Sequence, residues 1–273
     1  MSFQPTSVQS QWVGSYRRRM AVSVERMYEN ALDWAHLPYL HSDAFASIEL
    51  VEDGDWGWRA ILTQSTPATA KVATERRYGL QLTLDREHRR WISSTLDGPA
   101  AGSEIWTHVF EHAARDIEIQ ADFFVPNVPE EHKKKLGRAY QKLYAQLYDE
   151  DEAMMLARQA ALDHESEREA RVGQSLDLGA GERLASSAYT DFELAGKRWR
   201  LLKLEGDWQV YALSCPHQQG PLDKAKMVDG VVACPWHGYQ FDIRSGKCVS
   251  GHRCQLPTPP SLQWDQGHLI ARL

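Results

Sequence analysis

Two short segments in the last third of the chain limit its fold more than any other feature. Residues 215–217 read Cys-Pro-His and residues 234–237 read Cys-Pro-Trp-His, with sixteen residues between them. Each segment offers one thiol and one imidazole, and glycines at 220 and 238 predict a turn after each one. A fold that brings these four side chains together must place two facing loops around a shared metal group.

The donor set favours an iron–sulfur cluster over a single zinc ion. Two thiolates on one iron and two histidines on the other can hold a [2Fe–2S] cluster, and imidazole ligands raise its potential above that of a four-thiolate cluster. Zinc fingers use the same donors, but they usually pair Cys-x-x-Cys with His-x-x-x-His. We therefore assign Cys215, His217, Cys234 and His237 to a [2Fe–2S] cluster, with structural zinc as the alternative.

The other two cysteines, Cys248 and Cys254, lie outside both segments. All four cysteines follow residue 214, which excludes a disulfide framework for the whole chain. We expect Cys248 and Cys254 to be buried free thiols, with a disulfide between them as the less favoured alternative because stable disulfides are rare in cytoplasmic proteins.

A polar, glycine-containing stretch near residues 164–181 indicates a domain boundary. The 273 residues suffice for two modest domains. We therefore predict an N-terminal domain at 1–162, a linker at 163–175 and a C-terminal domain at 176–273.

The N-terminal domain mixes strand-like and helical patterns. Residues 12–22 suggest a strand, Ser23 is a plausible N-cap of a helix, and Pro38 should end or bend that helix. A long helix is expected from Pro129 to about residue 162. This order predicts an α+β fold with a helix-grip, START-like domain, whose antiparallel sheet wraps a long C-terminal helix, followed by a small all-β domain. Strand-like segments lie at 47–51, 57–63, 73–84, 91–96, 104–112 and 117–125.

The pattern Asp33-x-x-His36-x-x-x-x-His41 suggests a second metal site. On a regular helix, His36 and His41 would lie about 140° apart, so a break at Pro38 is needed to make them converge. Two histidines and a carboxylate on one face of Fe(II) form the facial triad of non-haem iron oxygenases. The alternative is that both histidines are ordinary packing or surface residues.

The third ligand must come from elsewhere, and we assign it to Asp151. This carboxylate interrupts an apolar stripe of the long helix, and a buried carboxylate is costly unless it is paired or bound to metal. A solvated acidic patch is the alternative, since its neighbours are also acidic. Asp149, Asp116 and Asp122 are the other candidate ligands.

Residues 176–273 closely resemble a Rieske ferredoxin domain, by the two cysteine–histidine segments. With the Asp33, His36 and His41 motif and the acidic segment 148–155, the whole chain resembles the catalytic subunit of Rieske non-haem iron (ring-hydroxylating) oxygenases. High-potential Rieske proteins carry an extra disulfide inside the ligand loops, so the comparison favours the oxygenase type. In common members the Rieske domain comes first, whereas this chain has the reverse, permuted order.

The resemblance implies that an external ferredoxin or a flavin- and NAD(P)H-dependent reductase reduces the cluster. Electrons would then pass across Asp33, the catalytic bridge, to His36 and a mononuclear Fe(II). The iron would insert one or two oxygen atoms from O2 into a small apolar or aromatic substrate. It also implies a homo-oligomer, with a trimer favoured. A Rieske electron carrier fused to a metal-free small-molecule-binding domain is the alternative.

Three residues of the segment 104–112 are candidates for lining the substrate pocket. Trp106, His108 and Phe110 share one face if this segment is a strand. The alternative is that they are packing residues or exposed.

The charge balance and the hydropathy pattern narrow the set of partners. With 31 basic and 37 acidic residues, a net charge of −6 gives no general reason to bind nucleic acid or anionic lipid. No apolar run reaches the roughly 18 residues of a membrane span, and the N-terminus lacks the pattern of a signal peptide. We therefore expect a cytoplasmic protein that does not associate with membranes.

Overall fold

The computed structural model describes residues 10–65, 76–166 and 174–273 of the chain. The chain divides into two compact units, Met1–Leu156 and Ala157–Leu273. The first combines helices with a large antiparallel sheet, and the second consists mainly of short strands. The α+β class is confirmed, with a helix-grip, START-like unit followed by a small β-rich one.

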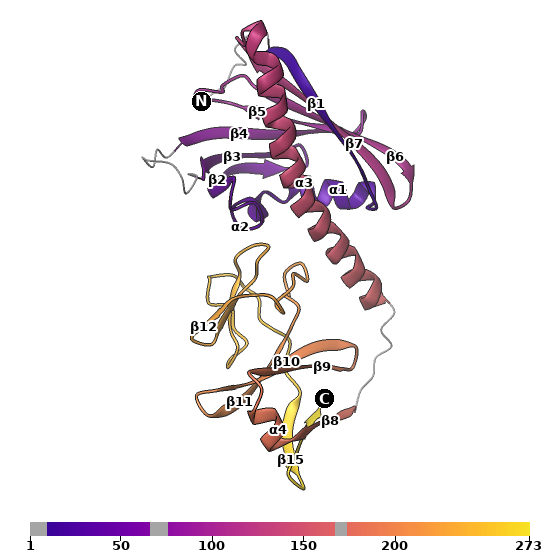
Figure 1. Ribbon diagram of the computed structural model, residues 1–273, viewed down its shortest axis with the longest axis vertical. Coiled ribbons are helices and arrows are strands. Elements are labelled where there is room, and N and C mark those ends of the chain that lie inside the picture. The colour runs from indigo at the N-terminus through magenta and orange to yellow at the C-terminus, as the bar shows by residue number, and fades with distance from the viewer. Residues whose placement is uncertain (1–9, 66–75, 167–173) are drawn as a thin grey trace. The chain divides into compact units, whose positions relative to one another are not determined.

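The sheet of the first unit has seven strands in the order β1-β7-β6-β5-β4-β3-β2 (Figure 1). Every neighbouring pair of strands is antiparallel. The first strand of this sheet, β1, pairs with its last strand, β7. The long helix α3 (Glu130–Ser166) lies across this sheet (Figure 1). The strands are β1 (Ser10–Met20), β2 (Phe45–Gly54), β3 (Gly57–Gln64), β4 (Arg76–Asp85), β5 (Arg90–Thr95), β6 (Glu104–Ala113) and β7 (Asp116–Pro126).

Strand β7 shows why one face of the sheet is the core face. Its alternate residues Ile117, Ile119, Ala121 and Phe123 are all fully buried, because successive side chains of a strand point to opposite faces. Phe123 stacks on Tyr140 of α3, with ring centroids 5.0 Å apart. The helix therefore packs on the apolar face that this alternation creates.

Helix α3 approaches strand β1 most closely at two glycines. A side-chain carbon at Gly137 would overlap the backbone carbonyl of Val13, and one at Gly14 would lie 3.3 Å from the Cα atom of Gly137. Helix and strand therefore meet backbone to backbone here, which only glycine permits.

The segment between β1 and β2 contains three short helical pieces: α1 (Val24–Leu32), a 3-10 turn (Trp34–His36) and α2 (Leu37–Leu40). Ser23 caps α1 as expected, accepting a hydrogen bond from the backbone N–H of Arg26 at 3.2 Å. The prediction that Pro38 ends or bends this helix is wrong. Helix α1 ends already at Leu32, and Pro38 lies in the first turn of α2, where a missing N–H costs no helical hydrogen bond.

Helix α3 extends into the segment 163–175, which we expected to be a linker. Residues 163–166 continue the helix, and β8 (Ser175–Ala180) already begins at the last linker position. The linker residues 167–173 lie outside the described part of the chain.

The second unit contains three small sheets, each of three strands. One of its apolar cores is built around Trp199 and Leu201, with Leu178 and Leu269 contributed by the first and last strands of the unit. The sheets are β9 (Tyr189–Leu194), β10 (Lys197–Leu204) and β11 (Asp207–Ala212); β12 (Met227–Val228), β13 (Val231–Ala233) and β14 (Gln240–Asp242); and β8, β15 (Ser261–Asp265) and β16 (His268–Arg272), with α4 at Gly181–Ala185.

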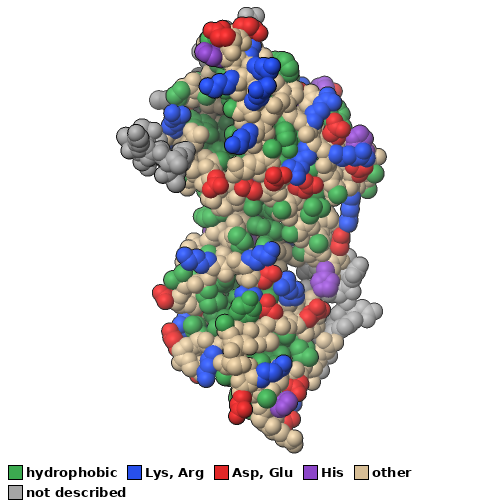
Figure 2. All heavy atoms as spheres, in the orientation of Figure 1, with side chains coloured by type: hydrophobic (Ala, Val, Ile, Leu, Met, Phe, Trp, Pro, Cys, Tyr) green, Lys and Arg blue, Asp and Glu red, His purple; other side chains and the backbone are tan. Residues whose placement is uncertain are grey.

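On the face shown in Figure 2, each unit carries a mixture of acidic and basic side chains. In the described residues, no helix is both long enough and apolar enough to cross a membrane.

The close approach at Gly137 predicts that an alanine at this helical position lowers the stability of the protein. Helix propensity alone predicts that Gly137→Ala stabilises the protein by about 1 kcal/mol. We expect the opposite, a loss of about 1–3 kcal/mol, because the added methyl group overlaps the Val13 carbonyl. Urea unfolding followed by circular dichroism measures the change. The exposed Lys142→Ala on the same helix is the control and should change stability by less than about 0.5 kcal/mol. A stabilised Gly137→Ala variant would contradict the packing.

Candidate metal centres

The two cysteine–histidine segments form loops of the same backbone design. The N–H of Cys215 donates to the carbonyl of Gly220 at 2.8 Å, and the N–H of Cys234 donates to that of Tyr239 at 2.8 Å. In each loop the residue four positions after the cysteine, Gln219 or Gly238, has a positive φ and donates its N–H back to the cysteine carbonyl. Local hydrogen bonds therefore hold both loops in matching shapes.

These loops place the four donor side chains as two unlike pairs. Cys215 and Cys234 are 1 % and 2 % exposed and share a hydrogen bond between their thiols. His217 and His237 form the other pair, with ring centroids 4.6 Å apart and planes at 86°. His237 is buried whereas His217 is exposed, so one imidazole of the pair faces solvent.

The two thiols of the pair differ in acidity, because their shared hydrogen bond and burial raise the pKa of Cys215 above its usual range. The hydrogen bond with Cys215 lowers the pKa of the Cys234 thiol, although burial acts in the opposite direction. Gly220 leaves room for this pair, because a side-chain carbon there would lie 2.8 Å from the Sγ atom of Cys234. The close approach accounts for glycine after the first loop.

The four loop donors are arranged differently from the donors of the first unit. Within the described parts of the chain, one group of three metal-ligating side chains has its donor atoms within 4.8 Å of one another, and it lies in the first unit. The loop donors do not converge to that extent. A thiol pair and an imidazole pair, with one member of each from either loop, match the two irons of a [2Fe–2S] cluster.

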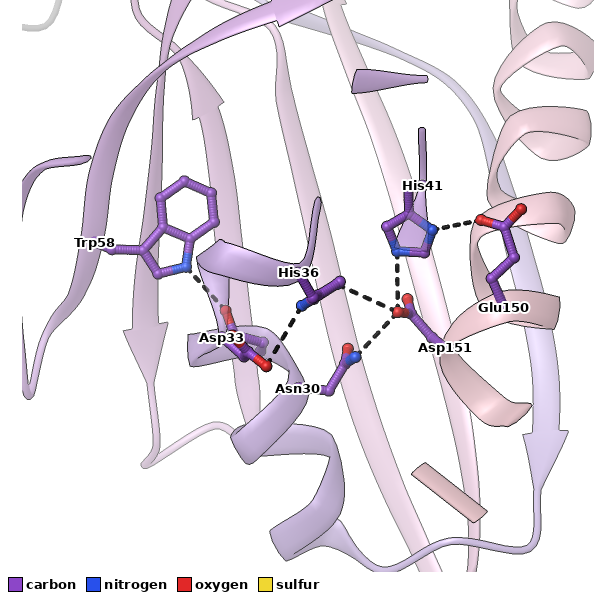
Figure 3. A network of polar contacts seen from close by, with 8 residues as sticks. Asn30, Asp33, His36, His41, Trp58, Glu150 and Asp151 are labelled. Carbon is purple, nitrogen blue, oxygen red and sulfur yellow. Dashed lines mark hydrogen bonds and ion pairs between the residues drawn. The ribbon is translucent and has the colours of Figure 1, made fainter. Parts of the chain in front are cut away.

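The convergent group consists of His36, His41 and Asp151, and all three are buried (Figure 3). The Oδ1 atom of Asp151 lies 3.0 Å from Nε2 of His41 and 3.5 Å from Nε2 of His36. Ligands about 2.1 Å from one ion at right angles lie about 3 Å apart, so these distances fit a shared metal ion.

The two histidines converge because they do not lie on one regular helix: His36 ends the 3-10 turn and His41 follows the single turn of α2. Asp33 is the C-cap of α1, with φ −82° and ψ 74°, and the 3-10 turn redirects the chain before His36. His41 caps the end of α2. The expected break at Pro38 is therefore replaced by the 3-10 turn and by the end of α2 at Leu40.

The alternative carboxylates are engaged away from the two histidines. Asp149 is exposed and pairs with Arg18 at 2.5 Å. Asp116 pairs with Arg19, and Asp122 accepts hydrogen bonds from Ser15 and Gln120. Of the four candidate carboxylates, only Asp151 contacts the histidines.

Two side chains that support this candidate site were not identified from the sequence. The amide of Asn30 donates to Oδ1 of Asp151 at 3.0 Å, and Nδ1 of His41 lies 2.5 Å from Oε2 of Glu150 (Figure 3). Asn30 lies three residues before Asp33, about one helical turn, and Glu150 adjoins Asp151, so both positions could have been found from their spacing. Glu150 orients the ring of His41, as carboxylates commonly do for metal-bound histidines.

The Nδ1 atom of His36 is buried and has no hydrogen-bond partner among the described residues. It lies 3.8 Å from Oδ2 of Asp33, which is longer than a hydrogen bond. Asp33 thus lies next to His36 on the side opposite Asp151.

Mutual contacts hold Asp151 and His41 in their charged forms. Burial raises the pKa of Asp151, but the hydrogen bonds from His36 and His41 outweigh it, so the pKa is lowered well below its usual range. Burial lowers the pKa of His41, but Asp151 and Glu150 outweigh it, so that pKa is raised. A metal ion at this site would have to displace the proton from His41.

The expectation that Trp106, His108 and Phe110 line an internal pocket is wrong. They share one face of β6, as predicted, but the buried residues Thr107 and Val109 occupy the opposite, core face. Phe110 is 47 % exposed. The partners of these three residues on β7 are Asp122, Gln120 and Glu118, which mark the polar outer face of the sheet.

Cys248 and Cys254 are free thiols, as expected, but they are not buried. Both side chains are partly exposed, because they lie in the irregular segment after β14. The expectation of buried thiols is therefore wrong.

Comparison with known proteins agrees with the loop geometry. Residues 171–260 match the family model of the Rieske [2Fe-2S] domain. Mouse apoptosis-inducing factor 3 is 35% identical over 63 residues, which are 23% of this chain and 10% of that protein. Chlorophyllide a oxygenase of Chlamydomonas reinhardtii is 33% identical over 79 residues, 29% of this chain and 11% of that protein. The chain thus spans about a tenth of the length of these curated relatives.

Solved structures match parts of the chain at low TM-scores. Norcoclaurine synthase from Thalictrum flavum has a TM-score of 0.43 and 20% identity, covering 55% of this chain and 88% of that one. An oxygenase–ferredoxin complex of carbazole 1,9a-dioxygenase has a TM-score of 0.31 and 15% identity, covering 36% of this chain and 28% of that one. The fold assignment depends on the strand order and on the long helix α3. The family match and the paired loops identify residues 171–260 as a Rieske [2Fe-2S] domain.

Proposed function

We propose that this chain is a Rieske-type non-haem iron oxygenase that inserts oxygen from O2 into a small organic substrate. The observation that carries the proposal is the buried convergence of His36, His41 and Asp151 in a chain that also contains a Rieske domain. An electron-transfer domain joined to a buried site with two histidines and one carboxylate provides the two components that such an enzyme needs.

The donor chemistry of the first unit suits ferrous iron. Fe(II) held by two imidazoles and one carboxylate keeps open positions and supplies dioxygen activation. Asn30 and Glu150 hold Asp151 and His41 in place through hydrogen bonds. Burial of all three donors keeps bulk water away from the site.

We propose that Asp33 connects the two metal centres. The carboxylate lies beside Nδ1 of His36, and a small movement would let it accept the N–H of that ring. Its second oxygen could accept the N–H of a cluster histidine, His217 or His237, within an assembly of several copies. A carboxylate shared by two imidazoles is a short covalent and hydrogen-bonded route for electrons.

The proposal includes partners of defined chemistry. A ferredoxin or a flavin- and NAD(P)H-dependent reductase supplies electrons to the cluster, and the substrate is a small apolar or aromatic molecule. A homo-oligomer, with a trimer favoured, and a cytoplasmic location complete the proposal. The relative chlorophyllide a oxygenase is a chloroplast protein, and this location is not part of the proposal for the present chain.

A second candidate function is an electron carrier whose first unit binds a small molecule without metal. It is favoured by the hydrogen bonds of Asp151 with Asn30 and His41, which provide this buried carboxylate with partners without a metal ion. The two functions differ in iron content and in oxygen consumption.

Iron content tests the proposed function. Anaerobically purified protein, reconstituted with Fe(II), should contain about three irons and two sulfides per chain, two of the irons belonging to the cluster. His36→Ala and Asp151→Asn should each lose about one iron and keep the visible spectrum of the cluster, because the two sites share no ligand. Iron and sulfide analysis, with spectra before and after dithionite, measures both quantities.

Asp149→Asn is the matched control for Asp151→Asn. It changes an exposed carboxylate of the same helix and should keep all three irons. Two irons in the unchanged protein, with no oxygen uptake after reduction, would reject the oxygenase and favour the electron carrier. A colourless protein containing zinc would reject both.

Asp33→Asn tests the connection between the centres. With both sites filled, the variant should keep its iron content and its cluster spectrum, while reoxidation of the reduced cluster by O2 slows by about 10–100-fold. Stopped-flow absorbance measures this rate in a single turnover. The exposed Asp43→Asn serves as control and should leave the rate unchanged. Equal rates in Asp33→Asn and in the unaltered protein would exclude this role.

A further inference from the structure

Cys248 and Cys254 lie directly opposite each other in a short antiparallel pairing. Lys247 pairs with Gln255 in that register, and the N–H of Cys248 donates to the carbonyl of Cys254 at 3.3 Å. Residues directly opposite in an antiparallel pair have Cα atoms about 4.5–5.5 Å apart. A disulfide needs about 4.4–6.8 Å. The backbone therefore already meets the main requirement for a bond between these residues.

The two thiols also contact each other and remain accessible. Their side chains share a hydrogen bond, and the Sγ atom of Cys248 lies 3.3 Å from Oγ of Ser250. Both cysteines line an open depression on the second unit, together with Lys247, His252, Arg253 and Gln255. The cluster cysteines are buried, so a reagent in solution reaches Cys248 and Cys254 first.

The two thiols are unequal. Burial raises the pKa of Cys248, but hydrogen bonds from Ser250 and neighbouring groups outweigh it and lower that pKa overall. Burial and the neighbouring Cys248 raise the pKa of Cys254 to about 11. Cys248 is thus the better nucleophile and Cys254 the resolving thiol.

A metal site explains the arrangement of Cys248 and Cys254 less well than sulfur chemistry does. Cys248, His252 and Cys254 are three possible ligands within seven residues, but they are absent from the one convergent donor group found in the described residues. The register and the contact between the thiols favour sulfur chemistry instead.

We propose that Cys248 and Cys254 form a reversible dithiol–disulfide site that reacts with low-molecular-weight disulfides of the glutathione class. The Cys248 thiolate attacks one sulfur of the small disulfide, forms a mixed disulfide and releases one thiolate. The Cys254 thiolate then attacks the Cys248 sulfur and releases the second. Two protein thiols are oxidised to one disulfide, one small disulfide is reduced to two thiols, and the protons pass to the leaving groups.

This site is connected to the cluster through stacked rings. His252 lies between the two cysteines in sequence, and its ring stacks on Tyr239 with centroids 3.7 Å apart and planes at 4°. Tyr239 in turn stacks on the cluster ligand His217 at 4.5 Å and 12°. Closing the disulfide fixes the segment that carries His252, so it changes the surroundings of His217. This inference is independent of the proposed iron site.

Glutathione redox buffers test the site on the full-length protein with its cluster. After equilibration, acid quenching, alkylation and peptide mass mapping should find a disulfide between Cys248 and Cys254 that dithiothreitol reverses, while the cluster absorbance is kept. Cys254→Ser should instead accumulate a mixed disulfide with glutathione at Cys248, because the resolving thiol is missing. Unmodified thiols in the most oxidising buffer, or glutathione on both cysteines without a disulfide, would overturn the proposal.

The midpoint potential of the cluster tests the connection to His217. It should shift between the dithiol and disulfide forms of the unaltered protein. The double variant Cys248→Ser, Cys254→Ser should show no shift in the same buffers, which controls for direct effects of glutathione. A potential that is equal in both forms would overturn the coupling.

Discussion

The contact of Asp151 with His36, His41 and Asn30 is the interaction on which the first unit depends. A carboxylate removed from water is costly unless charged or polar partners replace its hydration. Here three partners from the segment between β1 and β2 meet a carboxylate of α3, more than a hundred residues later in the chain. The same contact fixes the helix relative to that segment and assembles the candidate iron site.

The position of α3 that permits this contact is set nearer the N-terminus of the helix. Gly137 and Gly14 allow helix and strand to meet backbone to backbone, and Phe123 stacks on Tyr140 one turn later. These contacts set the depth and rotation of the helix. Asp151 then faces the histidines, whereas Asp149, two residues earlier, faces solvent and Arg18.

The two metal centres are built by different means. The cluster loops are held by short-range hydrogen bonds that repeat in both, so six or seven consecutive residues define each loop. The candidate iron site forms only when α1, α2 and α3 have packed together. This difference explains why the cluster ligands could be assigned from local spacing. The geometry at His36 and His41 was expected for the wrong reason, a break at Pro38 instead of a 3-10 turn followed by a one-turn helix.

The sequence by itself determined the two cysteine–histidine loops, the α+β class with its long helix, and the carboxylate of α3 that interrupts an apolar stripe. These features depend on residues close in the chain or on simple periodicity. Tertiary structure decided which face of β6 is internal, because a period of two shows that Trp106, His108 and Phe110 share a face but not which side α3 covers. It also decided the support of Asp151 by Asn30 and the pairing of Cys248 with Cys254, since contacts between separate segments follow from packing and register.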